Sequence, residues 1–431
     1  MRIVIITLGS YGDVQPYVAL GVGLQASGHK VRLLTHETYE PFIREWGLDF
    51  HPVGGNPLDI LTSDLGKEMV GTGTNPVAFM RTFARTGNEL MEHLFVGCWT
   101  GSQGAEAIIF SVSGLFAAGY HVAEKLGVPF YAAFLQPVNP TRSFPNAIFP
   151  PLPAWLSAGR GAYNVLAHHL STQLAWQLCR QPINDKRRTV LDLPELSLFG
   201  PFNRLLNSPH PILYGYSPTI LPKPPEWPAW VHVTGYWFLD TPAHWTPQPG
   251  LVDFLESGPP PVYIGFGSMS DRDPERTTRL LVKALGRARQ RGILLGGWGG
   301  LSNADLPDDV YHVERVPHDW LFPRVAAVVH HGGLGTTMAG LRAGVPSIMV
   351  PFFVDQPFWA RRVYKLGAGP RPIPRKQLSS DNLSEAITIA TSDPLMRRRA
   401  KLLAKRIRAE RGVERAVDLF NHYSSKVELV K

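Results

Sequence analysis

Two stretches of this chain have the same local pattern. Residues 5–13 (IITLGSYGD) and residues 263–271 (YIGFGSMSD) both place an apolar, strand-like run before Gly, Ser and Asp in one register. Each stretch is followed by a helical pattern and a further short β-branched run, which is the order of a βαβ unit. Such alternation is typical of parallel sheets that are buried on both faces. The repeat therefore predicts two doubly wound α/β domains, each opening with a Gly-Ser turn.

The length of the chain agrees with two domains, because 431 residues exceed the roughly 250–300 residues at which one hydrophobic core stops growing. A proline-rich stretch over residues 221–261 suits neither a helix nor a central strand. We therefore predict domains over residues 1–235 and 259–431 with a linker over residues 236–258, and leave open a return of the last helix to the first domain. Both Gly-Ser turns are expected to face a cleft between the domains, since ligands of such sheets bind beyond the carboxyl ends of the strands.

The composition excludes several classes of protein. Hydrophobic residues make up 44% of the chain and charged residues 18%, which is not the composition of a disordered protein. Two cysteines, Cys98 and Cys179, cannot build a disulfide framework and suit a reducing compartment. No stretch approaches ~18 uninterrupted apolar residues, and the apolar run at residues 3–7 reads as a strand, not a signal peptide. We therefore expect a soluble, cytoplasmic protein.

The positive charge indicates the kind of partner. The net charge of +8 favours an anion such as nucleic acid, anionic lipid or a phosphorylated small molecule. Much of this charge lies in residues 394–420, a predicted helix with a basic face. A plain solvated face is the favoured interpretation of this helix, and a weak peripheral membrane contact is left open. We expect no nucleic-acid partner and a monomeric protein.

The sharpest local pattern spans residues 325–363. A strand that ends at His330 leads into a Gly-rich turn, and a helix is expected from about Thr336, with Thr336 and Thr337 as its caps. The pattern matches neither the P-loop nor the dinucleotide-binding fingerprint. Many α/β proteins contain Gly-rich strand-to-helix turns without a ligand, and this interpretation also stays open.

The turn itself suits a diphosphate. Gly332, Gly333 and Gly335 lack side chains, so backbone N–H groups can approach a ligand closely. The start of a helix presents free N–H groups and a positive dipole end, which favour an anion. His331, placed just before the helix, can donate a hydrogen bond to a phosphate oxygen. We predict a diphosphate held by backbone groups and helix dipole, without a P-loop lysine.

A second polar pair follows the next strand. Asp355 and Gln356 offer a carboxylate and an amide at its carboxyl end, groups that suit the hydroxyls of a sugar. Asp355 is also a good N-cap for the helix that contains Trp359, and the two interpretations are compatible.

Five motifs spread over nearly the whole chain carry a resemblance to a known family. They are residues 9–57, residues 137–145 (PVNPTRSFP), residues 262–269 (VYIGFGSM), residues 316–337 and residues 351–363. Together they resemble the family 1 inverting glycosyltransferases of GT-B fold, in the branch of sterol glucosyltransferases and glycopeptide-antibiotic glycosyltransferases. The resemblance implies two facing Rossmann-like domains, the first binding the acceptor and the second the nucleotide sugar. It also implies metal-independent transfer of a hexose, glucose from UDP-glucose, to a hydroxyl, with no cofactor besides this co-substrate.

The resemblance further implies roles for single residues. The donor diphosphate would contact His331, the sugar hydroxyls would contact Asp355 and Gln356, and the nucleobase would lie beside residues 316–320. Trp298 and Trp320 are both candidates to stack on the base. The residues implied to bind the nucleotide sugar are Ser10, Gly12, Ser268, Val316, Trp320, His331, Gly333, Gly335, Thr336, Asp355 and Gln356.

The resemblance makes Asp13 the general base. A carboxylate within hydrogen-bond reach can take the proton of an acceptor hydroxyl, which is otherwise a poor nucleophile. The alternative is a helix cap, because Asp13 precedes Pro16 and a helix expected over residues 16–27. Tyr11 departs from the family pattern, which usually has a basic residue there, and this departure puts the choice of acceptor in doubt.

Several alternatives remain open. Asp271-Arg272-Asp273 has the DxD spacing of metal-dependent glycosyltransferases, but Pro274 follows and helix capping explains the pattern better, so no metal is expected. The aromatic residues of 59–99 and 137–202 either line a site for a lipophilic acceptor such as a sterol or belong to the core. A natural-product glycosyltransferase that uses a TDP- or UDP-sugar, a sugar-nucleotide epimerase and a catalytically silent partner protein are the competing functions.

Overall fold

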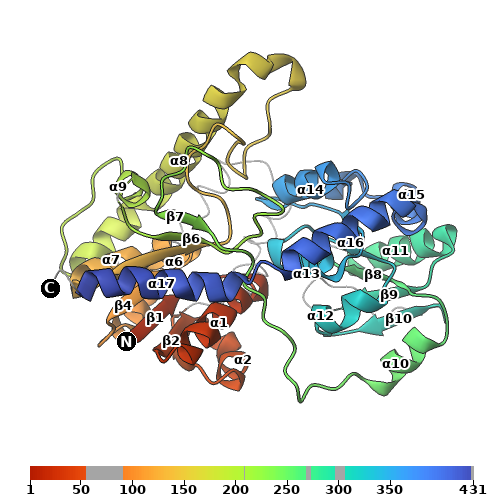
Figure 1. Ribbon diagram of the computed structural model, residues 1–431, viewed down its shortest axis with the longest axis horizontal. Coiled ribbons are helices and arrows are strands. Elements are labelled where there is room, and N and C mark those ends of the chain that lie inside the picture. The colour runs from red at the N-terminus through yellow and green to blue at the C-terminus, as the bar shows by residue number, and fades with distance from the viewer. Residues whose placement is uncertain (55–90, 208, 268–272, 297–305, 429–431) are drawn as a thin grey trace. The chain divides into compact units, whose positions relative to one another are not determined.

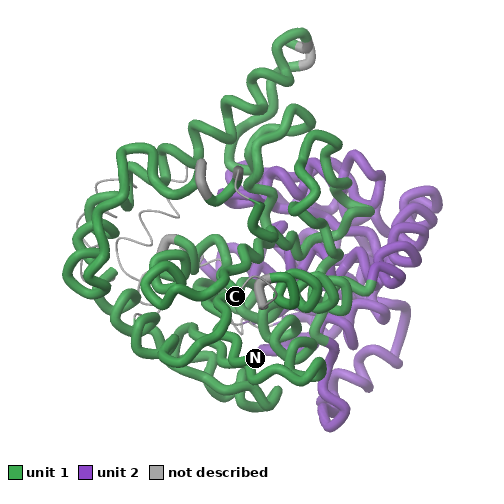
Figure 2. Tube along the Cα trace, turned by 60° about the vertical axis from the view of Figure 1, so that its left-hand side comes forward, with its two compact units in different colours: residues 1–239, 411–431 green, residues 240–410 purple. Residues whose placement is uncertain are grey.

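The computed structural model describes residues 1–54, 91–207, 209–267, 273–296 and 306–428, and these residues form two compact units (Figure 1). Unit 1 consists of Met1–Leu239 together with Arg411–Lys431, and unit 2 is Asp240–Glu410 (Figure 2). Unit 2 is thus inserted in the sequence of unit 1. The predicted cleft between the units stays a prediction.

Unit 1 is built on a parallel sheet of seven strands in the order β3-β2-β1-β4-β5-β6-β7. Ile5 and Leu33 are fully buried neighbours in register on β1 and β2, and each such side chain contributes about 1.5–3 kcal/mol of hydrophobic stabilisation. The edge strand β3 was not predicted, because its sequence DFHP is mostly polar and contains a proline, which an edge strand tolerates. The strands are β1 (Arg2–Ile6), β2 (Lys30–Thr35), β3 (Asp49–Pro52), β4 (Ala107–Phe110), β5 (Phe130–Phe134), β6 (Ile212–Tyr214) and β7 (Val231–Val233).

The helices of unit 1 come from both parts of its sequence. α17 packs on α1, where a Cβ at Gly23 would overlap the side chain of Val413. Further along α17, Ser424 Oγ lies 2.6 Å from Tyr131 Oη of β5. The helical segments described in unit 1 include α1 (Tyr11–Ala26), α2 (Glu40–Glu45), α6 (Val112–Ala117), α7 (Gly119–Leu126), the 3-10 helix η2 (Ala154–Gly159), α8 (Arg160–Thr189), α9 (Phe202–Asn207) and α17 (Gly412–Glu428).

Unit 2 contains a second parallel sheet, with five strands in the order β10-β9-β8-β11-β12. Val262, Ile264 and Val329 from its central strands are fully enclosed in one hydrophobic core. The edge strand β10 was not predicted, because its central residues Tyr311 and His312 are only half-buried. The strands are β8 (Val262–Gly265), β9 (Gly292–Leu295), β10 (Val310–Val313), β11 (Ala327–His330) and β12 (Ser347–Met349).

Two helices of unit 2 correct the predicted organisation. The predicted linker contains α10, whose Leu251 is 2% exposed and joins a core cluster of unit 2, so these residues are part of a domain. The predicted helix over residues 394–420 is two helices, because the chain turns at Arg411, which has φ +51°. The described helices are α10 (Pro249–Glu256), α11 (Pro274–Ala288), α12 (His318–Leu321), α13 (Leu334–Ala343), α14 (Gln356–Lys365), α15 (Ser380–Ser392) and α16 (Pro394–Arg408), with the 3-10 segments η3 (Phe322–Arg324) and η4 (Arg375–Gln377).

None of the helices in the described ranges has the length and apolar character that crossing a membrane requires.

Candidate active site

The turn after β1 in unit 1 holds Asp13 by a reciprocal cap. Oδ2 of Asp13 accepts hydrogen bonds from the backbone N–H and the hydroxyl of Ser10, both at 2.8 Å. This capping box starts α1 at Tyr11, so the predicted start at Pro16 is wrong, and Pro16 lies inside the helix. Asp13 occupies the third position of α1 rather than its N-cap. In the part of the chain that the structure describes, Oδ1 of Asp13 has no hydrogen-bond partner.

Gly9 makes this arrangement possible. Its φ of +132° is one that side chains with a Cβ rarely adopt, and a Cβ there would lie 2.5 Å from Asp13 Oδ2. The carbonyl of Gly9 accepts a hydrogen bond of 3.1 Å from the hydroxyl of Tyr39. The first Gly of the Gly-Ser turn therefore leaves the space into which the carboxylate folds back.

The surroundings of Asp13 make its carboxyl group a stronger base. Burial raises the pKa of Asp13, and the hydrogen bonds from Ser10 oppose this rise only in part. Tyr17, Tyr39 and Tyr236 lie around it, and burial together with the Asp13 charge raises the pKa of all three phenols. These phenols stay protonated at neutral pH, and Asp13 is the group in this cluster that can take a proton.

The other residues of the turn are exposed to solvent. Gly12 and Tyr11 are exposed, and the ring of Tyr11 packs against Phe42 of α2 with ring centroids 4.9 Å apart. The aromatic residue that departs from the family pattern is therefore held by unit 1 itself. Ser10 is committed to Asp13, which adds a structural role to the predicted contact with the nucleotide sugar.

The Gly-rich turn of unit 2 leads directly into α13. Gly333 is the N-cap of this helix and offers no side chain, so no side-chain hydrogen bond caps its first turn. The predicted helix start at Thr336 and the predicted capping by Thr336 and Thr337 are therefore wrong. Thr337 instead donates its hydroxyl to the carbonyl of Gly333 at 2.8 Å, whereas Gly335 and Thr336 lie half-exposed in the first turn.

His331 is enclosed by glycines. A Cβ at Gly333 would overlap its Nε2, and a Cβ at Gly267, after β8, would lie 3.0 Å from its Cε1. Nδ1 of His331 is buried and has no hydrogen-bond partner among the described residues. A buried polar atom without a partner is costly, so a ligand that accepts or donates a hydrogen bond here would relieve that cost.

Three histidines share this region of unit 2 and are uncharged at neutral pH. Burial, helped by the charge of His318, lowers the pKa of His331 to about 4. Burial also lowers the pKa of His318 to about 4 and that of His330 well below its ordinary value. Nδ1 of His330 accepts from the N–H of Gly332 at 3.1 Å, which fixes the turn. His331 is therefore a neutral hydrogen-bonding group, not a cation.

Asp355 and Gln356 lie beside this turn. A Cβ at Gly332 would be 3.3 Å from the carbonyl oxygen of Gln356, so the two segments touch. Oε1 of Gln356 accepts from the backbone N–H of Phe352 at 2.8 Å, and Oδ2 of Asp355 accepts from Nε1 of Trp359 at 3.0 Å. Asp355 occupies the N-cap position of α14, as predicted. Its side chain makes no capping hydrogen bond to the first turn of that helix.

Two residues of unit 2 were missed by the sequence analysis. Val354, directly before Asp355, has φ +56°, which is an outlier for a β-branched residue and costs on the order of 1–3 kcal/mol. His318 lies inside a motif that carried the resemblance, and its Nε2 is 3.3 Å from the hydroxyl of Tyr263. No sequence signal marks the strain at Val354. His318, in contrast, could have been noticed as a further histidine before the Gly-rich turn.

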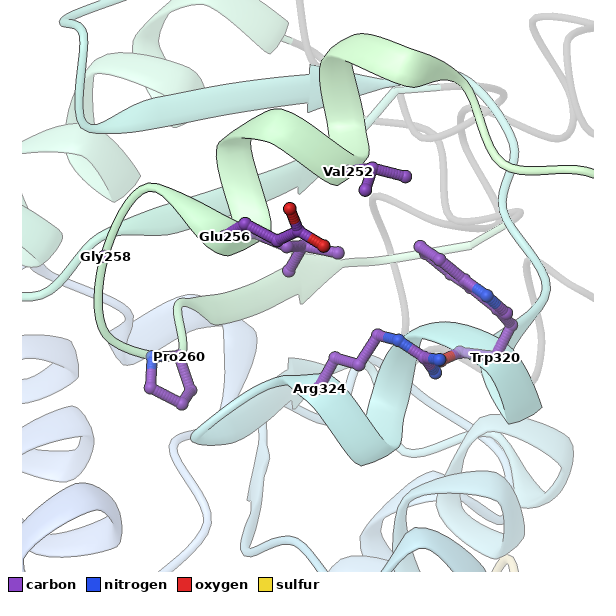
Figure 3. Close-up of a pocket in the computed structure, with 7 residues that line it drawn as sticks. Val252, Glu256, Gly258, Pro260, Trp320 and Arg324 are labelled. Atoms are coloured by element: carbon purple, nitrogen blue, oxygen red, sulfur yellow. The ribbon is translucent and has the colours of Figure 1, made fainter.

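Val316 and Trp320 lie in a core cluster and in a pocket of unit 2, respectively. Val316 is buried in a core cluster of unit 2. Trp320 packs against Trp245 and beneath Arg324, in a pocket of about 280 Å³ that also contains Pro260, just before β8 (Figure 3). This pocket lies toward the amino end of β8, whereas the Gly-rich turn follows the carboxyl end of the parallel strand β11. A nucleobase beside residues 316–320 stays a prediction.

The structure does not describe every residue that the sequence pointed to. Ser268, Trp298, Asp271 and Arg272 lie outside the described residues. Asp273 is described, and it caps α11 by accepting a hydrogen bond of 3.0 Å from the N–H of Arg276, which confirms the capping interpretation of this residue. Within the described ranges, no three His, Cys, Asp or Glu side chains come together as metal ligands would.

Two family models match the sequence. The glycosyltransferase family 28 N-terminal domain matches residues 3–145, and the C-terminal domain of erythromycin biosynthesis protein CIII-like proteins matches residues 299–415. The first match contains the Asp13 turn, and the second contains the Gly-rich turn and Asp355-Gln356.

Curated relatives decide the family. A sterol 3-beta-glucosyltransferase of Arabidopsis thaliana is 38% identical over 433 residues, which cover 98% of this chain and 68% of that protein. The chain belongs to the sterol 3-beta-glucosyltransferase family. A family member from Candida albicans is 38% identical over 446 residues, which cover 100% of this chain and 28% of that protein. Another from Cryptococcus neoformans is 37% identical, and the chain spans 27% of its length.

Solved structures confirm the fold of this family member. The calicheamicin glycosyltransferase matches with a TM-score of 0.65 and 17% identity over 99% of this chain and 98% of that one. A Streptomyces sp. SF2575 glycosyltransferase complexed with thymidine diphosphate matches with a TM-score of 0.63 and 19% identity over 98% and 99%. The predicted GT-B fold class, with two parallel-sheet α/β units, is therefore correct.

Proposed function

We propose that this protein is an inverting glucosyltransferase that transfers glucose from UDP-glucose to the hydroxyl of a sterol or a similar lipophilic alcohol. The observation that carries the proposal is the uncapped start of α13 with His331 in front of it. Free N–H groups, a positive dipole end and a buried imidazole nitrogen without a described partner suit the diphosphate of a nucleotide sugar. The relatives named above supply the acceptor class, since each is called a sterol 3-beta-glucosyltransferase.

The donor sugar would be held by Asp355 and Gln356. The proximity of Gln356 to the Gly-rich turn supports this role, because sugar and diphosphate are covalent neighbours in the donor. The strained backbone at Val354 fixes the direction in which this pair leaves β12. Ser268 and the backbone of Gly333 and Gly335 would contribute further polar contacts.

Asp13 would act as the general base. Its carboxylate takes the proton of the acceptor hydroxyl while the hydroxyl oxygen forms a bond to the anomeric carbon of the glucose. The raised pKa of Asp13 makes it a better proton acceptor than an ordinary aspartate. Attack from the face opposite the diphosphate turns the α-linked donor into a β-glucoside.

The diphosphate would leave without a metal ion. As the bond from the anomeric carbon to the phosphate oxygen breaks, negative charge grows on the diphosphate. The N–H groups at the start of α13 and a hydrogen bond from neutral His331 would stabilise that charge. No proton transfer to the leaving group is required, because the diphosphate of a nucleotide is a good leaving group at neutral pH.

A product assay tests the proposal. The purified chain is incubated with UDP-glucose and a 3-hydroxysterol in detergent micelles, and the product is analysed by mass spectrometry and by its anomeric coupling constant in NMR. A steryl β-glucoside supports the proposal, and an α-glucoside contradicts inversion. Asp192→Asn, at a fully exposed side chain of unit 1, is the control for Asp13→Asn.

The competing functions give different products. A natural-product glycosyltransferase is favoured by the structural neighbours, one of which was solved with thymidine diphosphate. A panel of UDP- and TDP-sugars with polyketide and flavonoid acceptors separates it from a sterol enzyme. An epimerase would convert UDP-glucose in the absence of any acceptor, and a silent partner protein would give no product in either experiment.

A further inference from the structure

One side of α8 in unit 1 exposes an apolar surface. Leu166, Leu170 and Leu174 recur every four residues, so they lie on one face of the helix, and they are 54%, 44% and 52% exposed. The opposite side of the helix packs into unit 1, where His168 and Trp176 are buried. The three leucines therefore form a helix face that faces away from the core of unit 1.

Two neighbouring segments extend this surface. The 3-10 helix η2, just before α8, carries Trp155, which is 80% exposed. Beside the middle of α8, the side-chain amides of Gln173 and Gln177 donate to the carbonyl of Leu198 at 2.9 and 2.7 Å, which holds the neighbouring Phe199 on the same helix. We call the resulting surface the α8 face. It comprises Trp155, Leu166, Leu170, Leu174, Leu198 and Phe199.

The α8 face is carried by the part of unit 1 that extends furthest from its sheet. In Figures 1 and 2, η2 and the first turns of α8 project away from the other elements of unit 1. A buried tryptophan such as Trp176 belongs to the core, whereas Trp155 at this tip does not. The aromatic residues of 137–202, which the sequence left undecided, thus divide into core and surface.

The segment that carries the α8 face, apart from Leu198 and Phe199, has a net positive charge. Residues 125–184 contain no aspartate or glutamate. Arg160 is exposed at the first position of α8, and the side chain of Arg142 lies near Gly161, where a Cβ would be 3.5 Å from Arg142 Cβ. Arg160 and Arg142 therefore lie near the apolar tip. Glu226, which accepts a hydrogen bond of 2.7 Å from the backbone N–H of Arg142, offsets part of this charge.

We propose that the α8 face docks the protein on a bilayer that contains anionic phospholipids. Apolar side chains in the headgroup region, an exposed tryptophan and flanking arginines are the groups by which interfacial helices bind such surfaces. A second copy of this chain is a poorer occupant, because it would bring the same cations against one another. The inference goes beyond the proposed function, since it does not depend on the acceptor or the donor.

A second surface offers a matched comparison. α16 in unit 2 exposes Leu395 and Leu402, which are 59% and 55% exposed, among arginines and lysines. It carries more positive charge than the α8 face but neither an aromatic residue nor a row of leucines at four-residue spacing. If charge alone bound the protein to lipid, α16 would be the binding surface.

Vesicle flotation with the full chain tests the proposal, in the absence of nucleotide sugar and sterol. The vesicles contain phosphatidylcholine alone or with added phosphatidylglycerol. The variant Leu166→Glu/Leu170→Glu changes the α8 face, and Leu395→Glu/Leu402→Glu makes the same change of charge on α16. We expect binding of the wild-type chain to the anionic vesicles, a loss of about 10-fold or more in the α8 variant, and a much smaller loss in the α16 variant.

Four outcomes would overturn the proposal. The first two are that the wild-type chain binds neither kind of vesicle, or that both variants lose binding equally. The third is a dimer in analytical ultracentrifugation that the α8 substitutions dissociate. The fourth is a melting temperature of the α8 variant far below that of the α16 variant. The last two would mean that another copy or the chain itself covers the face. Loss of glucosyl transfer with intact vesicle binding would bear on the proposed function alone.

Discussion

The turn after β1 in unit 1 and the turn after β11 in unit 2 both start a helix, but among the described residues only in the first does a carboxylate of the chain bind the cap residue. In unit 1, Ser10 and Asp13 form a reciprocal cap, so the chain supplies its own anion. In unit 2, the cap residue is Gly333 and no side chain covers the start of α13. One helix start is closed by a carboxylate, and the other is open to an external anion.

In the proposed function, the two turns serve two different steps of the transfer reaction. The Asp13 carboxylate at the start of α1 is held where burial raises its pKa, which suits its proposed role as the base. The open start of α13 keeps its dipole and N–H groups for a ligand, and the imidazole beside it is neutral. Proton removal and charge stabilisation are thus assigned to separate turns, and four substitutions test that assignment.

Asp13→Asn should have the largest effect. The amide can still accept the hydrogen bonds from Ser10 but cannot take a proton, so kcat should fall about 10³-fold. The dissociation constant of UDP, measured by calorimetry, should not change. The melting temperature should not fall, because the raised pKa means that an ionised carboxylate at this position costs stability above that pKa. Turnover equal to that of Asp192→Asn would remove Asp13 as the base.

His331→Ala should act on the other turn. Loss of one hydrogen bond to the developing charge should lower kcat about 10²-fold. Unlike Asp13→Asn, this change should also weaken UDP binding, about 10-fold, since the contact with the diphosphate exists in the ground state. His244→Ala, at an exposed histidine of unit 2, is the control. Unchanged UDP binding would place the diphosphate away from the Gly-rich turn.

Gly333→Ala tests the space around the imidazole. The new Cβ would overlap Nε2 of His331, so the ring must move and UDP binding should weaken severalfold. Gly286→Ala in α11 is the matched control, because its Cβ meets nothing within 4 Å and the change should raise stability by up to about 1 kcal/mol. Chemical denaturation and calorimetry measure both effects. Equal behaviour of the two variants would mean that the imidazole position is unimportant.

Ser10→Ala should have the smallest effect, visible in a pH profile. The Ser10 hydroxyl stabilises the ionised form of Asp13, so its loss raises the pKa of Asp13 further. Because the base must be ionised, kcat/KM should decline on the acidic side in both proteins, and the decline should begin at a higher pH in the variant. At pH values well above both pKa values the rates should agree. A decline that begins at a lower pH in the variant would contradict the idea that the Ser10 hydroxyl lowers the pKa of Asp13.

The fold was largely predictable because its central strands are continuous apolar runs. β1, β4 and β8 are buried on both faces, so their sequences are recognisable as apolar, β-branched runs. The two missed strands, β3 and β10, both lie at the edges of their sheets, where polar residues and a proline are tolerated. The other two edge strands, β7 and β12, are more fully buried and kept the apolar signal on which the prediction depended.

The identity of the site residues stays a prediction, whereas the local geometry around them can be compared with the sequence analysis. Gln356 lies next to the Gly-rich turn that contains His331, as the motif over residues 325–363 implied. Both helix starts were placed too late, because the prediction looked for caps next to Pro16 and Thr336. Neither the backbone at Val354 nor the tyrosines around Asp13 leave a local pattern, since tertiary packing creates them.

The place of α17 has a consequence for the order in which the protein is made. Helix α17 is translated after all of unit 2, yet it supplies a face of unit 1, where Asn421 reaches within 2.8 Å of His29 Nε2. On the ribosome, unit 2 can therefore acquire its full set of contacts while unit 1 still waits for its last helix. During that interval, the apolar surface of α1 around Gly23 stays exposed. A chaperone that binds nascent chains would bind at this surface.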